Sequence, residues 1–199
     1  MGRIGLLGGT FDPIHNAHLY MGNLCIDKLN LDKVIYIPAG ITPHKTYIAD
    51  IGARYEMVKL AISGNERFSV SDYEIKKETP SYSVETVDYF KKLYPGDEIV
   101  FILGEDSLDY VEKWHNAQKF LKMCSFAVIA RGGFESDIDA KINMLKEKYG
   151  AIVYNVCSRE LEISSSNIRD MISEQKSVKH LVPQVVVDFI DKQKLYQGE

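Results

Sequence analysis

The sequence has few cysteines and no segment typical of export or membrane insertion. Its three cysteines, Cys25, Cys124 and Cys157, are scattered and form no C-x-x-C pair. An odd, unclustered set is typical of a reducing compartment and argues against a disulfide framework. The first residues lack the apolar core and cleavage site of a secretory signal, and no apolar run approaches the ~20 residues of a membrane helix. We therefore expect a cytoplasmic protein without a membrane partner.

The chain also lacks a net positive charge and two common nucleotide-binding motifs. It has 24 Lys and Arg against 28 Asp and Glu, for a net charge of −4. A general nucleic-acid-binding protein usually carries a basic face, so we expect no nucleic-acid partner. A small nucleotide remains compatible, because a few local cations can bind phosphate. The absence of G-x-x-x-x-G-K-[ST] and of a well-placed G-x-G-x-x-G excludes a P-loop and a dinucleotide fingerprint.

What the chain does contain is a regular alternation of apolar, β-branched runs with helical patterns. The runs predict strands at 3–7, 33–37, 68–70, 98–103, 126–130 and 151–156, with an extension of the third to residue 75 left open. The helical patterns lie at 17–29, 51–63, 83–94, 107–114, 117–123, 137–149, 166–173 and 184–194. This order predicts an α/β fold, doubly wound, with a mostly parallel sheet and helices on both faces. We expect one domain, 1–199, with a C-terminal helical part from about 164 to 199 packed on it.

The most distinctive run is GGTFDPIHNAH, residues 8–18. It follows the first predicted strand and leads into a helix, an arrangement in which free backbone N–H groups can hold a phosphate. His15 and His18, at positions i and i+3, add donors on the same helical face. The residues alone leave two other interpretations open: a capped helix with solvated histidines, or a metal site that lacks an evident third ligand.

A second run, SSSNIR at residues 164–169, reads as a serine-rich N-cap followed by a helix. Arg169 lies about one turn into that helix and can reach an anion at its N-terminus with a planar donor fork. An ordinary helix cap is the alternative. The segments 8–18, 38–45 and 104–106 and Arg131 all follow predicted strands. Parallel strands would bring them to one edge of the sheet, where ligands bind in such folds.

These segments resemble one known family. GGTFDPIHNAH resembles the GxFDPxHxxH motif of the nucleotidylyltransferases, and ISSSNIR, residues 163–169, resembles their closing ISSTxIR motif. PHK at 43–45, GED at 104–106 and Trp114 are similar to segments of the bacterial nicotinate mononucleotide adenylyltransferases. The resemblance extends over nearly the whole chain. Ala17, Thr42 and Ser166 depart from the more usual Gly, Pro and Thr, and Ser166 keeps the hydroxyl.

The resemblance implies a Rossmann-like fold and an activity: transfer of the adenylyl group of ATP to nicotinate mononucleotide, with release of pyrophosphate. It implies Mg²⁺ brought in with ATP and no metal held by the protein. The residues it would make catalytic are His15, His18 and Arg169. Those it would place against ATP are Gly8, Gly9, Thr10, Phe11, His15, His18, Gly104, Asp106, Ser164, Ser165, Ser166 and Arg169. Those it would place against nicotinate mononucleotide are Thr10, His44, Lys45, Thr86, Trp114 and Arg131.

Within that second set, the resemblance implies that Trp114 stacks on the pyridine ring and that backbone near Thr86 holds the nicotinate carboxylate. Arg54 is either a support for the PHK segment or an exposed helix charge.

Three other functions remain open at this stage. One is another nucleotidylyltransferase, acting on phosphopantetheine or glycerol phosphate. His44, Lys45 and Trp114 argue against it, since those acceptors have no aromatic ring to stack. A non-catalytic nucleotide sensor is disfavoured by the intact His15, His18 and Arg169. A metal-dependent hydrolase would need further ligands. The sequence leaves open whether the chain forms a homo-oligomer.

Overall fold

The six predicted strands form one sheet in which every neighbouring pair is parallel. The computed structural model describes residues 1–41, 48–131, 138–158 and 163–197. Its strands are β1 (Arg3–Gly9), β2 (Lys33–Pro38), β3 (Phe68–Val70), β4 (Glu98–Gly104), β5 (Ser125–Arg131) and β6 (Ile152–Ser158). Their order in the sheet is β3-β2-β1-β4-β5-β6. The order reverses between β1 and β4, as in a doubly wound Rossmann-like fold.

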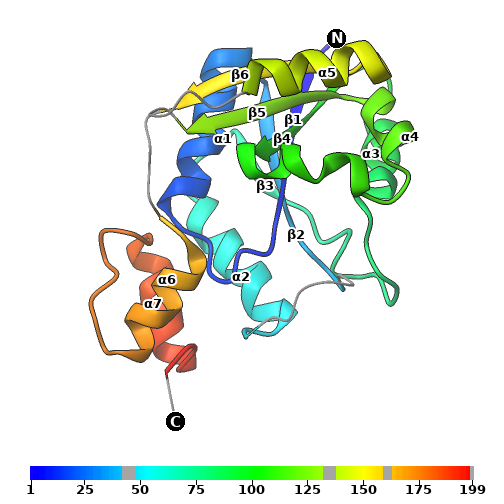
Figure 1. Ribbon diagram of the computed structural model, residues 1–199. Helices are drawn as coiled ribbons and strands as arrows, with labels where there is room; N and C mark the ends of the chain where they lie inside the picture. The colour runs from blue at the N-terminus through cyan, green and yellow to red at the C-terminus, as the bar shows by residue number, and fades with distance from the viewer. Residues whose placement is uncertain (42–47, 132–137, 159–162, 198–199) are drawn as a thin grey trace.

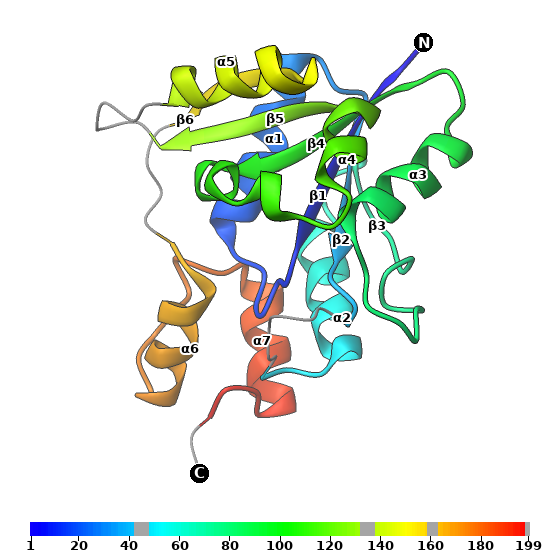
Figure 2. The same cartoon turned by 45° about the vertical axis from the view of Figure 1, so that its right-hand side comes forward.

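Helices cover both faces of this sheet (Figures 1 and 2). They are α1 (Asn16–Leu29), α2 (Ile51–Ile62), α3 (Ser83–Leu93), α4 (Ala117–Met123), α5 (Ile138–Tyr149), α6 (Ser165–Ser173) and α7 (Gln184–Gln193). Two short 3₁₀ helices, η1 (Glu105–Asp109) and η2 (Val111–Lys113), follow β4. In the part of the chain that the structure describes, no helix combines the length and apolar character needed to cross a membrane.

The core is divided by the sheet into two apolar clusters, because successive strand residues point to opposite faces. Leu7, Val34, Tyr36, Val100 and Ile102 pack on one face with residues of α1, α2 and α7. Leu6, Ile35, Ile99, Phe101 and Phe126 pack on the other with residues of α3, α4 and α5. Both faces of the central strands are therefore buried, which explains their near-continuous apolar sequences.

Several boundaries differ from those predicted by the sequence. β1 continues through Gly8 and Gly9, two residues beyond the strand predicted at 3–7, because they pair with Ile37 and Pro38 of β2. The turn comes after Gly9. β3 ends at Val70 and does not extend to residue 75. The helix expected at 107–114 is replaced by the two 3₁₀ helices.

The C-terminal helices α6 and α7 lie at the end of the sheet where the strands finish (Figure 1). Val186, Val187 and Ile190 of α7 are buried in the same cluster as residues of α2. After α7, Tyr196 reaches the loop that follows β1, where its hydroxyl donates to Asp12 at 2.7 Å. Figure 2 shows α7 beside α2 and below that loop.

Candidate active site

The candidate site lies where the strand order reverses. β1 and β4 are neighbours, and both end there in glycines, Gly9 and Gly104. The loop after β1 runs to His15, the N-cap of α1. At this position in a doubly wound sheet, the diverging connections leave a crevice in which ligands bind. At the start of α1, the N–H of Asn16 donates to the carbonyl of Leu181 at 2.9 Å, and those of His18 and Leu19 donate to the carbonyl of His15. The side chains of His15 and His18 are therefore the main donors that this helix end can offer an anion.

His15 and His18 stack on each other at this helix end. Their ring centroids are 3.7 Å apart with an interplanar angle of 24°. The backbone N–H of His15 donates to Nδ1 of His18 at 3.3 Å. Nδ1 of neutral His18 is therefore the acceptor, which assigns its ring proton to Nε2. The rings of Phe11 and His18 meet edge to face, with centroids 5.0 Å apart, a contact that supports the His18 ring.

Burial keeps both rings uncharged near neutral pH. Desolvation lowers the pKa of His15 from 6.5 to about 4. Desolvation, and secondarily the proximity of His15, lowers the pKa of His18 well below 6.5. Nδ1 of His15 is buried without a hydrogen-bond partner among the described residues. A buried polar atom of this kind is costly unless something satisfies it. The pair is suited to donating N–H groups to an incoming phosphate, whose charge would favour protonation.

Lowering the pH should reduce the free energy of unfolding, because His15 is buried in its neutral form. Because its folded pKa is lower than its unfolded value, the unfolded chain binds more protons between pH 6.5 and 4, and stability is lost as the pH falls through that window. Between pH 7.5 and 5.0 the loss from His15 is about 2 kcal/mol. Urea unfolding at both pH values should show a smaller loss for His15→Gln than for the wild type.

The control for this measurement is His180→Gln, since His180 is exposed. It should lose stability on acidification as the wild type does. An equal loss in all three proteins would contradict the burial of a neutral His15.

The second predicted motif meets the first. Ser164 caps α6 by accepting from the N–H of Asn167 at 3.2 Å. Oγ of Ser165 donates to the carbonyl of Pro13 at 2.9 Å. Nη1 of Arg169 donates to the carbonyl of Asp12 at 2.7 Å. Two segments far apart in the sequence thus form one polar cluster around the loop after β1.

Arg54 is buried beneath the same loop and is not an exposed helix charge. It is 1% exposed, and its guanidinium donates to the carbonyl of Thr10 at 2.8 Å and to that of Ala39 at 2.9 Å. The loop after β1 is therefore tied to the loop after β2. The alternative of a surface charge, which the sequence left open, is wrong.

Trp114 and Thr86 lie on the face of the sheet that α3 and α4 cover, Trp114 after η2 and Thr86 on α3. Trp114 is half-buried and stacks on Phe120, with centroids 5.6 Å apart. Thr86 is 1% exposed. Its hydroxyl donates to Glu74 at 2.6 Å and its N–H donates to the carbonyl of Tyr82 at 3.1 Å. Both hydrogen-bond donors of Thr86, its hydroxyl and its N–H, are therefore occupied in this conformation. The first two N–H groups of α3, those of Ser83 and Val84, are the ones a helix leaves unpaired.

The other predicted residues have varied positions. Gly8 and Gly9 are the last two residues of β1, and a Cβ on Gly9 would lie 2.8 Å from the Phe11 ring. Phe11 is 0% exposed, so only its backbone can meet a nucleotide. Asp106 is exposed on η1, and Ser166 is exposed on α6. Arg131 is the last residue of β5. His44 and Lys45 lie outside the described residues.

Two residues at the site were not found from the sequence. The carboxylate of Asp12 is 4% exposed and accepts from Oη of Tyr196 at 2.7 Å. Asp12 was visible inside the first motif, but nothing near Tyr196 marks it as a site residue. Within the described ranges, no group of three or more His, Cys, Asp or Glu side chains could hold a metal ion.

Comparison with known proteins identifies the family of this chain. The family described as cytidylyltransferase-like matches residues 6–171. A protein of Clostridium beijerinckii named probable nicotinate-nucleotide adenylyltransferase is 46% identical over 204 residues, covering 99% of this chain and 100% of the relative. A protein of Clostridium botulinum (strain Loch Maree / Type A3) with the same name is 43% identical over 197 residues, covering 96% and 98%.

A solved structure shares the fold. Nicotinic acid mononucleotide adenylyltransferase of Plasmodium falciparum, complexed with NaAD, superposes with a TM-score of 0.80. It is 23% identical in sequence, and the match covers 98% of each chain.

Proposed function

This chain belongs to the cytidylyltransferase-like family, and we propose that it transfers the adenylyl group of ATP to nicotinate mononucleotide. The products are nicotinate adenine dinucleotide and pyrophosphate, and the reaction is a step in making NAD. The relatives at 46% and 43% identity over nearly their whole lengths carry the corresponding name. The observation that carries the proposal is the convergence of His15, His18 and Arg169 on one loop at the sheet's reversal point.

The reaction requires that the two substrates are aligned and that the charge on the transferred group is stabilised. A phosphate oxygen of the mononucleotide attacks the α-phosphorus of ATP, and the bond from that phosphorus to the bridging oxygen of pyrophosphate breaks. The attacking oxygen is already anionic, so no general base is needed. What a protein can supply is in-line alignment and donors aimed at the charge that develops on the transferred group.

The residues of the loop and of α6 are suited to that task. His15 and His18 would donate N–H groups to the ATP phosphates at the N-terminus of α1. Arg169 would turn part of its donor fork to the same phosphates, alongside Ser164, Ser165 and Ser166 at the N-terminus of α6. Gly8, Gly9, Thr10 and Phe11 would offer backbone, and Gly104 and Asp106 would meet the ribose. The buried, unsatisfied Nδ1 of His15 supports this assignment.

Mg²⁺ would arrive as part of the ATP complex, so the chain's own side chains bind phosphate and need not form a metal site. The three free cysteines favour the cytoplasm. The polar contacts of α6 with the loop after β1 support residues 1–199 as a single functional domain. Nothing in this mechanism requires a homo-oligomer.

The mononucleotide would lie on the side of the crevice occupied by Trp114. With one face of the indole against Phe120, the other would stack on the pyridine ring. The N–H groups of Ser83 and Val84, near Thr86, would meet the nicotinate carboxylate. An amide would present its own NH₂ to one of these donors, which disfavours nicotinamide mononucleotide. His44, Lys45, Thr10 and Arg131 would complete the set around its phosphate.

We expect a preference for the acidic mononucleotide over its amide. Trp114→Ala should weaken both substrates and leave their ratio of kcat/KM roughly unchanged, because stacking reads the two rings alike. Trp114→Phe, which keeps an aromatic ring against Phe120, should lie between the variant and the wild type. The measurement is kcat/KM for both mononucleotides in the three proteins.

Two results would count against this assignment. Equal use of the acid and the amide by the wild type would contradict the preference. A ratio that collapses only on replacing Trp114 would show that the selectivity lies on that residue and not on the start of α3.

A further inference from the structure

The carboxylate of Asp12 connects three segments that are distant in the sequence. It accepts from the N–H groups of Ile48 at 3.0 Å and Ala49 at 3.2 Å, just before α2. It also accepts from Oη of Tyr196 at 2.7 Å, a partner 184 positions further along the sequence. Because Asp12 is 4% exposed, water cannot replace a donor that is lost. The three donors together fix the orientation of this side chain.

The backbone of the same residue carries the proposed phosphate ligands. The carbonyl of Asp12 accepts from Nη1 of Arg169, and the carbonyl of Pro13, the next residue, accepts from Ser165. His15 begins α1 two residues later. A displacement of Asp12 would therefore also shift the two carbonyl groups that α6 contacts and the start of α1, where the histidines lie.

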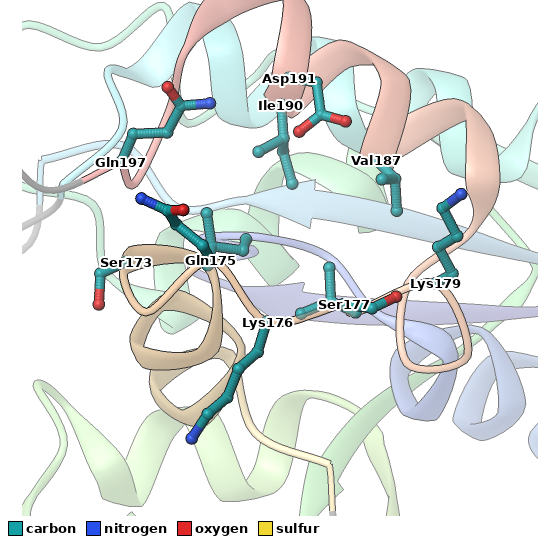
Figure 3. A pocket seen from close by; sticks show the side chains of 11 residues that line it. Ser173, Gln175, Lys176, Ser177, Lys179, Val187, Ile190, Asp191 and Gln197 are labelled. Carbon is teal, nitrogen blue, oxygen red and sulfur yellow. The ribbon is translucent and has the colours of Figure 1, made fainter.

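Tyr196 is held by this contact and by the packing of its ring in the core cluster of α2 and α7. Its φ is 62°, and that of Lys194 is 55°, left-handed values that non-glycine residues adopt only when other contacts hold them. The next residue, Gln197, lines an open hollow of about 510 Å³ between α6 and α7 (Figure 3). On that side the C-terminal segment has little packing. The Tyr196 ring itself is 8% exposed, enclosed against the loop.

The Tyr196 hydroxyl remains a donor at all relevant pH values. Burial, followed by its hydrogen bond to Asp12, raises the pKa of Tyr196 above its usual value. Both arginines contact the loop that carries Asp12: Arg169 donates to the carbonyl of Asp12 and Arg54 to that of Thr10. The hydroxyl thus belongs to the same cluster as the arginines that hold the loop.

We propose that Tyr196 is a positioning residue for ATP, acting through Asp12 to fix the loop after β1 and Arg169. It is not a catalytic residue, because its hydroxyl is occupied by Asp12 and its ring is buried. The inference rests on the proposed function, since it assigns the C-terminal segment to the ATP half of that site. It adds a contact from the far end of the chain to the phosphate-binding motifs.

The test is Tyr196→Phe, which removes one oxygen and keeps the ring. We expect KM for ATP to rise about tenfold while KM for nicotinate mononucleotide changes less than twofold. Binding of ATP alone, measured by calorimetry, should weaken by the same factor. A purely structural role would lower the melting temperature without separating the two substrates.

Tyr154→Phe is the matched control. Oη of Tyr154 donates to Glu98 at 3.2 Å, also a tyrosine–carboxylate contact, but Glu98 begins β4 at the opposite end of the sheet. This variant should leave both KM values and the ATP affinity as in the wild type. Equal effects of the two substitutions, or ATP binding by Tyr196→Phe as tight as in the wild type, would overturn the inference.

The two proposals fail separately. If the wild type makes no dinucleotide, the proposed function is wrong, and calorimetry with ATP still tests Tyr196. If the wild type makes dinucleotide and Tyr196→Phe matches it in both assays, only the positioning role is wrong.

Discussion

Replacing His18 with alanine is expected to lower kcat by about 10²–10³ while the fold is retained, because one preorganised donor to a developing charge typically contributes this much. His18 is placed for that role by three contacts. It stacks on His15, rests on the edge of Phe11 and accepts from the His15 N–H. The loss should appear mainly in kcat, since the charge that Nε2 meets is greatest in the transition state.

His180→Ala serves as the control, because His180 is an exposed histidine on the connection between α6 and α7. Its turnover should equal that of the wild type. Activity of His18→Ala within a few-fold of the wild type, with an unchanged melting curve, would contradict the proposed role of the histidine.

The second large effect concerns stability. Arg54→Met should destabilise the protein by about 3 kcal/mol, because it removes two hydrogen bonds from a buried charged donor to carbonyl groups. Those carbonyls, of Thr10 and Ala39, then lose their partner. For a domain of this size, the melting temperature should fall by roughly 6–12 °C.

Arg67→Met is the matched control. Arg67 pairs with Asp27 at 3.8 Å, and its side chain is 53% exposed. Its replacement should change stability by less than about 0.5 kcal/mol. Similar melting temperatures for the two variants would show that Arg54 does not hold the loops together.

The fold could be predicted from the sequence because its signals are local and repeated. Apolar β-branched runs such as 98–103 alternate with helical patterns, and that alternation permits few architectures besides a parallel sheet covered on both faces. Strand ends were less accurate. Gly8 and Gly9 look like a turn on their own, and only the pairing with Ile37 and Pro38 makes them part of β1.

The candidate site was predictable to the extent that it lies in motifs. His15, His18 and Arg169 occur in two recognisable runs, and the structure brings those runs together through the carbonyls of Asp12 and Pro13. Tyr196 was not predictable, because its contact with Asp12 spans 184 residues and depends on how α7 packs against α2. The burial of Arg54 depends in the same way on tertiary packing, and no local pattern distinguishes it from an exposed helix arginine.

The chemistry itself can be tested in one measurement. The purified protein is incubated with MgATP and nicotinate mononucleotide, and the dinucleotide and pyrophosphate are quantified over time. The proposed function predicts that nicotinate adenine dinucleotide and pyrophosphate appear in equal amounts, over many turnovers. Binding of ATP without either product, or release of pyrophosphate in the absence of the mononucleotide at the same rate, would contradict adenylyl transfer to this acceptor.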